Sequence, residues 1–310
     1  MKGIFINKNS QIRSGWKILI TFIMFFIITI IASIFLGMGY MIINIAIYGV
    51  NNASAIAEGI KSNDMVSIIS NIIQCICLIG SVVLLWKVFE KKPIREMGLV
   101  NIKKGYKDLV AGLIFGAISM SMVFAILLGS NNIQLVSSLT KPSFNIALLM
   151  ELILFIFVGF DEEMFTRGYC MSVLNQTRKK WVVVGVSSII FALMHSFNPD
   201  MTLLSYLNLF LVGVLFAYMF IKSNNLWLTI GYHITWNFFE GPVFGFQVSG
   251  LNMKSIYLVK KPADNIITGG GFGPEGGLVV TFIIILGLIY MWKFYKPTEQ
   301  ISLELGKTIV

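Results

Sequence analysis

The sequence predicts an all-α fold, a polytopic membrane bundle of about eight transmembrane helices. Hydrophobic residues make up 56% of the 310 residues and charged residues only 13%, about half the charged share of an ordinary soluble domain. The apolar residues also gather into runs long enough to cross a bilayer, because a spanning helix needs about 20 of them. Composition and run length together exclude a soluble protein.

Short polar segments separate these apolar runs. The first run follows Lys2, Lys8, Arg13 and Lys17 and is too long for the apolar part of a cleavable signal peptide, so we expect an uncleaved first span. The fourth run is too long to cross the bilayer straight. The expected spans are 18–44, 66–86, 108–128, 146–177, 181–197, 203–221, 226–243 and 277–292.

The basic residues predict the orientation of these spans. With the N-terminus placed inside, 18 of the 24 Lys and Arg residues fall in cytosolic segments and five fall outside, leaving Arg167 within the membrane. Cytosolic loops carry such an excess of basic residues. We therefore expect a multi-pass protein of the cell membrane with both termini in the cytosol. The net charge of +9 then reflects topology, and no nucleic-acid partner is expected.

Two loops are long, 49–65 and 244–276. The second loop ends in a run rich in glycine between residues 269 and 277, and we expect it to be flexible because glycine restricts the backbone least. No internal repeat is apparent in the chain.

The fourth apolar run contains the acids Asp161, Glu162 and Glu163, followed by Arg167. Ionisable residues inside a membrane span are costly and therefore indicate a functional or tightly paired group. Glu163 lies four residues before Arg167, on the same helix face and in the favourable order for an ion pair. Glu162 points in a different direction and has no local partner, which suits a general base.

The only two histidines of the chain, His195 and His233, also lie in apolar runs. Glu162 lies 18 residues before Lys180 and His195 lies 15 after it, so the helical rise places the two within roughly 5 Å of the same depth. His233 and Asn237 share a helix face, and both can donate hydrogen bonds to an oxyanion, bind a metal or join helices. Counted from Lys222, His233 comes out nearer the cytosol than the other two.

Three motifs resemble a known family. Glu162-Glu163-Met-Phe-Thr-Arg167 resembles the EExxxR motif of the CPBP (Abi) family, which includes the type II CAAX prenyl endopeptidases. Phe191-Ala-Leu-Met-His195 and His233-Ile-Thr-Trp-Asn237 resemble its FxxxH and HxxxN motifs. On this resemblance we divide the chain into N-terminal spans and a cytosolic loop (1–145), a protease-like core (146–243), and a glycine-rich loop with the last span (244–310).

The resemblance implies an intramembrane endopeptidase. Glu162 and His195 would activate a water molecule, His233 and Asn237 would hold the oxyanion, and Glu163 with Arg167 would be the structural pair at the site. The family is often described as metalloproteases, and Glu162, His195 and His233 would then be zinc ligands. We favour the mechanism without a cofactor, because the amide of Asn237 is a poor ligand for Zn²⁺ but a good hydrogen-bond donor.

Two other classes compete with this interpretation. Buried ionisable residues also line the pathways of transporters. Transporters often carry inverted repeats, and this sequence shows no internal repeat. A non-catalytic membrane immunity protein would keep the fold and would not need all four of the residues Glu162, His195, His233 and Asn237. The expected partners are the lipid bilayer and a peptide or membrane-protein substrate, in bacteriocin or peptide processing or in self-immunity. Nothing in the sequence indicates an oligomeric state.

Overall fold

The fold was analysed in a computed structural model that describes residues 2–7, 9–52, 59, 64–136, 138–260 and 264–296. The chain divides into two compact units, residues 1–91 and residues 92–310, and each is described by itself. The boundary between the units lies within the N-terminal part (1–145) of our division by motif content, and the helix within 92–145 packs on α10 (Trp227–Phe238).

The first unit contains two long apolar helices, α2 (Ser14–Tyr48) and α4 (Asp64–Phe89). They follow the short α1 (Lys2–Phe5) and are separated by the 3₁₀ turn η1 (Val50–Asn52). The buried side chain of Lys17 forms an ion pair with Glu90, which joins the start of α2 to the chain just after α4. Most of the expected loop at 49–65 lies outside the described residues.

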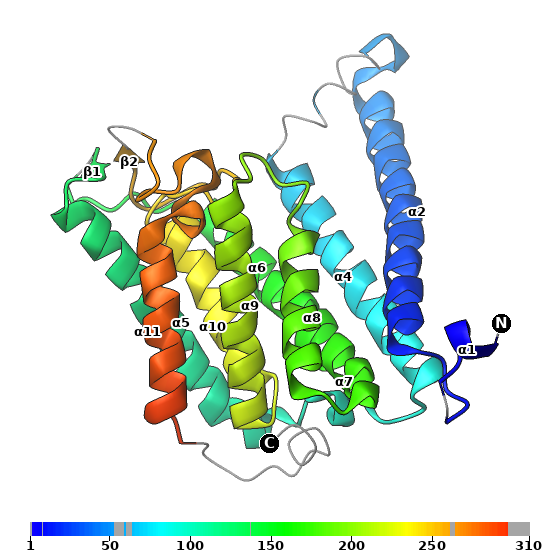
Figure 1. The fold of residues 1–310 in the computed structure, drawn as a ribbon. Helices are drawn as coiled ribbons and strands as arrows, with labels where there is room; N and C mark the ends of the chain where they lie inside the picture. The colour runs from blue at the N-terminus through cyan, green and yellow to red at the C-terminus, as the bar shows by residue number, and fades with distance from the viewer. Residues whose placement is uncertain are drawn as a thin grey trace. The chain divides into compact units, whose positions relative to one another are not determined.

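The second unit holds the other six expected spans (Figure 1). Some are single helices and others continue through 3₁₀ or π turns. In chain order its elements are η2 (Ile94–Met97), α5 (Ile102–Gly129), β1 (Gln134–Leu135), α6 (Ala147–Glu163), η3 (Met164–Cys170), α7 (Met171–Leu174), η4 (Asn175–Thr177), α8 (Lys180–Met194), α9 (Leu203–Ser223), α10 (Trp227–Phe238), η5 (Phe239–Val243), β2 (Val259–Lys260), η6 (Gly270–Phe272), η7 (Pro274–Gly276) and α11 (Leu278–Lys293).

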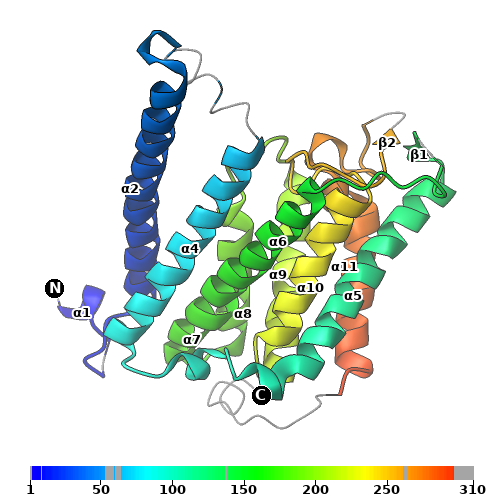
Figure 2. The same ribbon diagram turned by 180° about the vertical axis from the view of Figure 1, so that it is seen from behind.

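Helix α10 lies at the centre of the second unit, between α5 and α6 (Figure 2) and against α9. Glycines allow α5 and α10 to touch through their backbones. A Cβ atom on Gly112 would lie 2.2 Å from the carbonyl oxygen of Leu228, and one on Gly231 would lie 2.4 Å from that of Leu109. Small residues permit such close packing where lipid provides no hydrophobic drive between helices. The helix that carries His233 is therefore held firmly in the interior.

The described residues 244–260 and 264–277, which we call the glycine-rich cap, pack over the ends of α9, α10 and α11 (Figure 1). Its glycines have a role other than the flexibility we expected. Gly273 has a φ of +93°, and a Cβ atom there would lie 2.1 Å from the carbonyl oxygen of Gln247. Only glycine adopts that backbone conformation without strain in so small a space. One antiparallel pair of short strands, β1 and β2, joins the cap to the loop after α5.

These elements confirm the predicted all-α membrane bundle. Within the described ranges, four helical segments are long and apolar enough to cross a membrane alone, namely 14–48, 64–89, 94–129 and 203–223. The helices α8 and α11 are apolar but shorter. The fourth expected span, 146–177, is one run of α6, η3, α7 and η4, and the seventh, 226–243, is α10 followed by the π turn η5. Each expected span thus corresponds to a helical segment.

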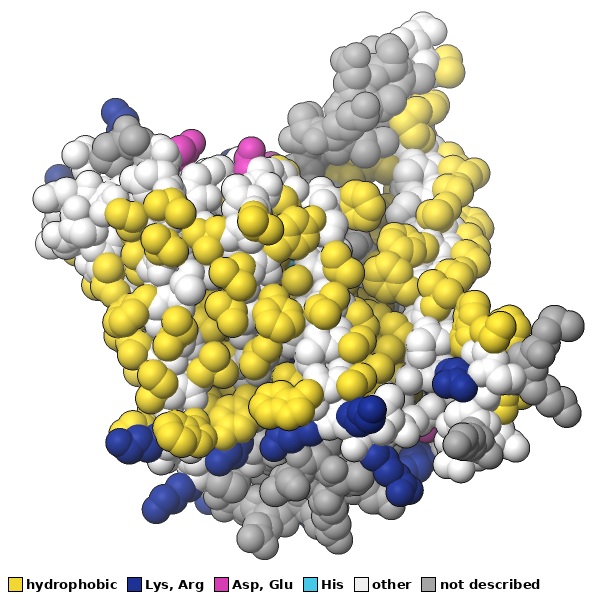
Figure 3. Space-filling model, viewed as in Figure 1, with side chains coloured by type: hydrophobic (Ala, Val, Ile, Leu, Met, Phe, Trp, Pro, Cys, Tyr) yellow, Lys and Arg dark blue, Asp and Glu magenta, His cyan; other side chains and the backbone are white. Residues whose placement is uncertain are grey.

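The surface of the second unit has the pattern of a protein in a bilayer (Figure 3). Hydrophobic side chains cover the flank of its helices, and Lys and Arg side chains gather along the lower rim in this view. Along the chain, Arg178 and Lys179 lie in the connection between α7 and α8, and Lys293 ends α11. Trp181 and Trp292, near these ends, are 82% and 71% exposed, as expected for side chains at a membrane interface. The direction of insertion remains a prediction from the charge distribution.

Single-cysteine reporters test the orientation. In a background without Cys75, Cys77 and Cys170, we expect Asn252→Cys, in the glycine-rich cap, to react with a membrane-impermeant maleimide in intact cells. Lys104→Cys, at the opposite end of the unit, should react only after the membrane is opened. Labelling of Lys104→Cys in intact cells would show that the charge rule misassigns the two sides.

Candidate active site

The fourth apolar run changes its helical form at the acidic residues. α6 ends at Glu163 and continues as the π-helix η3 over Met164–Cys170. Such π turns are rare and frequently occur at functional sites. The side chain of Glu162 is 18% exposed, whereas that of Glu163 is fully buried. The two neighbouring carboxylates therefore have different surroundings, as the helical periodicity predicts.

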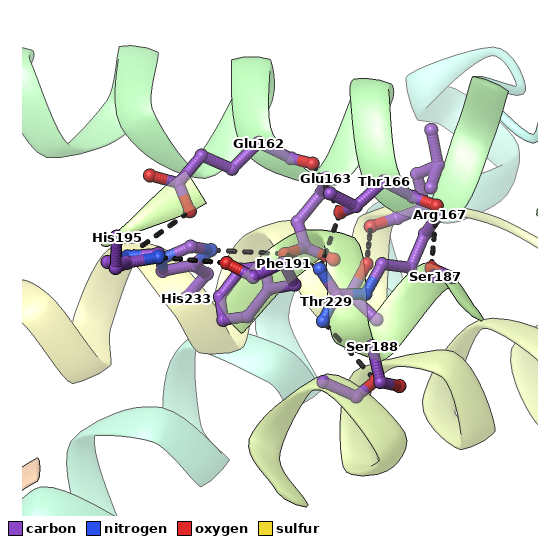
Figure 4. A network of polar contacts seen from close by, with 12 residues as sticks. Glu162, Glu163, Thr166, Arg167, Ser187, Ser188, Phe191, His195, Thr229 and His233 are labelled. Atoms are coloured by element: carbon purple, nitrogen blue, oxygen red, sulfur yellow. Dashed lines mark hydrogen bonds and ion pairs between the residues drawn. The ribbon is translucent and has the colours of Figure 1, made fainter. Parts of the chain in front are cut away.

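Glu163 binds two basic side chains (Figure 4). Its Oε1 accepts a hydrogen bond from Nη1 of Arg167 at 3.1 Å and lies 3.2 Å from Nδ1 of His233. Because an ionised carboxylate only accepts hydrogen bonds, Nδ1 of His233 carries the hydrogen. One buried carboxylate thus connects the π-helix to α10.

Arg167 is completely buried and is surrounded by groups that suit a guanidinium. Its Nη2 donates to the carbonyl oxygen of Gly213 on α9 at 3.3 Å. Its guanidinium carbon lies 4.3 Å from the ring centroid of Phe191 and 5.0 Å from that of Phe216, within the range of a cation–π contact. A buried charge is tolerated when it is paired and hydrogen-bonded. The contacts from α8 and α9 therefore add to the ion pair with Glu163 in stabilising the buried guanidinium.

His195 follows the last residue of α8 and faces Glu162 (Figure 4). Its Nδ1 lies 3.0 Å from the carbonyl oxygen of Phe191, so Nδ1 is the donor, and Nε2 carries the lone pair of the neutral ring. Nε2 lies 3.9 Å from Oε2 of Glu162, too far for a direct hydrogen bond. That oxygen is buried and has no hydrogen-bond partner among the described residues. Two acceptors therefore face each other across a gap that one water molecule can bridge.

His233 and Asn237 lie one turn apart on α10 and are 5% and 6% exposed. The ring of His233 packs between Phe191 and Phe216, with centroid distances of 6.1 Å and 5.4 Å. Within the part of the chain that is described, the amide of Asn237 makes no hydrogen bond. The structure therefore gathers both glutamates, the arginine and both histidines into one cluster, which Asn237 joins only through helix α10.

Counting residues along the sequence placed His233 nearer the cytosol than Glu162 and His195. In the structure His233 contacts Glu163, the neighbour of Glu162, so the expected difference in depth is absent. A Cβ atom on Gly168 would touch both Met97 and Leu226, so these three residues lie at one level. Glu163 is five residues from Gly168 and His233 is seven from Leu226, roughly 7 Å and 10 Å of helical rise. The run from α6 to α7 is oblique (Figure 2), so counting residues back from Lys180 overstates the depth of the acidic residues.

The donor atoms do not form a metal site. Zinc in a catalytic site takes three side chains at about 2.0–2.3 Å. Among the described residues, no group of three or more His, Cys, Asp or Glu side chains is placed to hold a metal ion. Of the ligands considered from the sequence, His233 directs Nδ1 to Glu163 and is not grouped with Glu162 and His195 as a third ligand. The set of Glu162, His195 and His233 therefore does not fit zinc as it stands.

The sequence did not reveal the role of Thr166. Its hydroxyl donates to the carbonyl oxygen of Glu162 and accepts from Nη1 of Arg167. Ser187 on α8 donates to the carbonyl oxygen of Thr166 at 2.8 Å. The π-helix is thereby fixed to α8, the helix that directly precedes His195. A threonine inside a helix commonly bonds the preceding turn, so nothing in the sequence distinguished this one.

Residues 142–239 match the family model described as "Type II CAAX prenyl endopeptidase Rce1-like". No curated protein matches the chain. The matched segment contains all six residues singled out above and ends before the glycine-rich cap. The match confirms the resemblance inferred from the three motifs and supports, at the level of the family, an intramembrane endopeptidase that acts on peptides in a lipid bilayer.

Removing one partner of the buried pair should destabilise the protein. We expect Glu163→Ala to lower the free energy of unfolding by about 3–5 kcal/mol, because Arg167 is left buried without its counter-charge. Thermal unfolding in detergent, followed by circular dichroism, measures the loss.

The control is Glu162→Gln, which removes a carboxylate whose Oε2 has no hydrogen bond among the described residues and should leave the unfolding temperature nearly unchanged. The double variant Glu163→Ala/Arg167→Leu should recover part of the stability, since neither charge remains. Equal stability of Glu163→Ala and the wild type would show that Glu163 is not the counter-charge of Arg167.

Proposed function

We propose that this chain hydrolyses a peptide bond within the membrane, using a water molecule activated by Glu162 and His195. The observation that carries the proposal is the gap between Oε2 of Glu162 and Nε2 of His195, which are 3.9 Å apart. Both atoms accept hydrogen bonds and neither is bonded to the other. A water molecule between them would donate one hydrogen to each, so its own lone pairs would point away from both side chains. A water molecule so held is positioned for attack on a substrate carbonyl.

The proton of the water has a defined route in this arrangement. Attack forms the bond between the water oxygen and the carbonyl carbon, and the proton passes to Glu162 or His195 as the carbonyl oxygen becomes an oxyanion. The same group then returns the proton to the leaving nitrogen when the peptide bond breaks. One residue pair thus serves as base and then as acid, in agreement with microscopic reversibility.

The oxyanion would be stabilised by His233 and Asn237. Since Nδ1 of His233 donates to Glu163, Nε2–H is a second donor only in the imidazolium form. That form balances the charge of the buried cluster, because the two carboxylates of Glu162 and Glu163 then face Arg167 and His233. The amide of Asn237 adds a neutral donor on the same helix face. Donors held in place before the reaction are the usual source of transition-state stabilisation.

The substrate in this proposal is a peptide or membrane-protein segment that enters the bundle from the bilayer. Peptide or bacteriocin processing and self-immunity are biological roles that such an activity can serve. A non-catalytic immunity protein would not need two acceptors facing each other across an unbonded gap, since that arrangement adds nothing to stability.

Replacement of the base tests the proposal. We expect Glu162→Gln to lower kcat/KM at least about 100-fold, because the amide keeps the shape of the carboxylate but cannot take a proton. The membrane peptidomes of cells producing the wild type and this variant, compared by mass spectrometry, should differ in peptides that only the wild type releases. Identical peptidomes, or normal turnover of a released sequence by purified Glu162→Gln, would refute the assignment of the base.

A second test concerns the absence of a cofactor from the proposed mechanism. The purified protein should keep its activity on such a peptide after exhaustive dialysis against 1,10-phenanthroline, because Glu162 and His195 supply the base and His233 with Asn237 supplies the oxyanion donors. Loss of activity that added Zn²⁺ restores, together with about one zinc per chain by elemental analysis, would replace this mechanism with the zinc-dependent one.

A further inference from the structure

A glutamate outside the matched segment 142–239 joins the two elements that carry the histidines. Glu275 lies in the glycine-rich cap, and both of its carboxylate oxygens accept hydrogen bonds. Oε1 accepts from Nε1 of Trp236 at 3.0 Å, and Oε2 accepts from Oγ of Ser249 at 2.5 Å. The residue is 9% exposed, so these bonds are shielded from competing water.

The first of these bonds leads directly to helix α10. Trp236 is three residues after His233 and immediately before Asn237, and it is 3% exposed. Its ring is stacked on that of Tyr232, with centroids 5.8 Å apart. The indole nitrogen can only donate, and Glu275 is the acceptor it uses. The rotation of α10 about its axis, which aims His233 and Asn237, is therefore tied to the cap.

The second bond leads to His195 through a continuous chain of hydrogen bonds. The carbonyl oxygen of Ser249 accepts from Nδ2 of Asn198 at 3.1 Å. The backbone N–H of Asn198 in turn donates to the carbonyl oxygen of His195 at 2.9 Å. The turn that follows α8, and with it the orientation of His195, is thus connected to Glu275 in three steps.

The backbone of the cap is shaped to bring Ser249 to this position. Ser249 and Gly250 both have positive φ, 48° and 85°, as the two central residues of a type I′ turn require. A Cβ atom on Gly250 would lie 2.5 Å from the carbonyl oxygen of Pro199, so the turn lies directly against the loop after His195. On the other side, Nδ2 of Asn208 on α9 donates to the carbonyl oxygen of Glu275 at 2.8 Å, which fixes the cap to the bundle.

We propose that Glu275 is a positioning residue, which holds the segment of His195 and the segment of His233 and Asn237 in one fixed relation through Ser249 and Trp236. The inference rests on the proposed function for its catalytic consequence, because the base and the oxyanion donors lie on these two segments. A small displacement of one against the other separates the activated water from the oxyanion site, and misplacement of about 1 Å can cost about 100-fold in rate.

The presence of only two histidines provides a test that needs no substrate. Protein labelled with carbon-13 in the imidazole rings gives one pair of signals for His195 and one for His233, assigned with His195→Gln and His233→Gln. We expect Ser249→Ala, next to the His195 segment, to shift the signals of both histidines. Trp236→Phe, which removes the indole N–H and keeps an aromatic ring, should also shift both. In a Glu275→Ala background each substitution should act only on the nearer histidine, because the connection between them is gone.

The matched control is Ser255→Ala. It removes a serine hydroxyl in the same cap that bonds the carbonyl oxygen of Tyr257 and not Glu275, so both histidine signals should stay in place. If Ser249→Ala and Trp236→Phe each shift only the nearer histidine in the wild-type background, the proposal fails. These two single variants give that answer even if Glu275→Ala does not fold.

Kinetics with a peptide released by the wild type complete the test. Glu275→Ala should lower kcat about 10- to 100-fold with KM changed less than about twofold, since no contact with the substrate is lost. Glu275→Gln should remain within about threefold of the wild type, because its amide oxygen accepts from Trp236 and its NH2 group donates to the hydroxyl of Ser249. Shifted histidine signals in a protein without peptidase activity would overturn the proposed function alone, and unmoved signals in an active protein would overturn the role of Glu275 alone.

Discussion

The arrangement of the site depends on one buried carboxylate, that of Glu163, and on the two basic side chains that it binds. A charge in the interior of a membrane bundle is stable only when it is neutralised and hydrogen-bonded. Glu163 meets this requirement with Arg167 on its own helix and His233 on α10. The same contacts draw α8 and α9 around the guanidinium, because Phe191, Phe216 and the backbone of Gly213 surround it. The cluster thus fixes the helices that carry the reactive groups.

The neighbouring Glu162 differs from Glu163 only in its surroundings. It is partly exposed and its Oε2 lies 3.9 Å from Nε2 of His195, whereas Glu163 is fully buried and its Oε1 contacts both Arg167 and His233. A reactive carboxylate must be able to change its protonation state, and a structural one must not. The helical step of about 100° between adjacent residues gives two consecutive glutamates different surroundings, one suited to the structural role and one to the proposed reactive role. The π-helix that follows and the hydrogen bonds of the Thr166 hydroxyl keep the two glutamate side chains in these different surroundings.

The helices of the candidate site are also held in position by residues that contribute no ionisable group to it. Gly112 and Gly231 let α5 and α10 touch, and the glycine-rich cap reaches over the bundle to bond Trp236 and the loop after His195. In a bilayer the helices gain little from apolar burial against one another, so close packing and hydrogen bonds decide their positions. This explains why a segment that carries no catalytic motif forms specific hydrogen bonds with the bundle.

The sequence by itself determined the helical membrane fold, the eight spans and the pairing of Glu163 with Arg167, because hydropathy and helical periodicity act over neighbouring residues. Its three motifs also predicted the six residues that we assign to the candidate site. The tertiary structure alone decided that His233 bonds Glu163 and that Nε2 of His195 faces Glu162 without bonding it. It also revealed the compact, bonded cap that the sequence presented as a flexible loop. Those outcomes depend on the obliqueness of α6, on backbone contacts at glycines and on bonds between residues far apart in the chain. None of these leaves a periodic signal, so no local pattern could have predicted them.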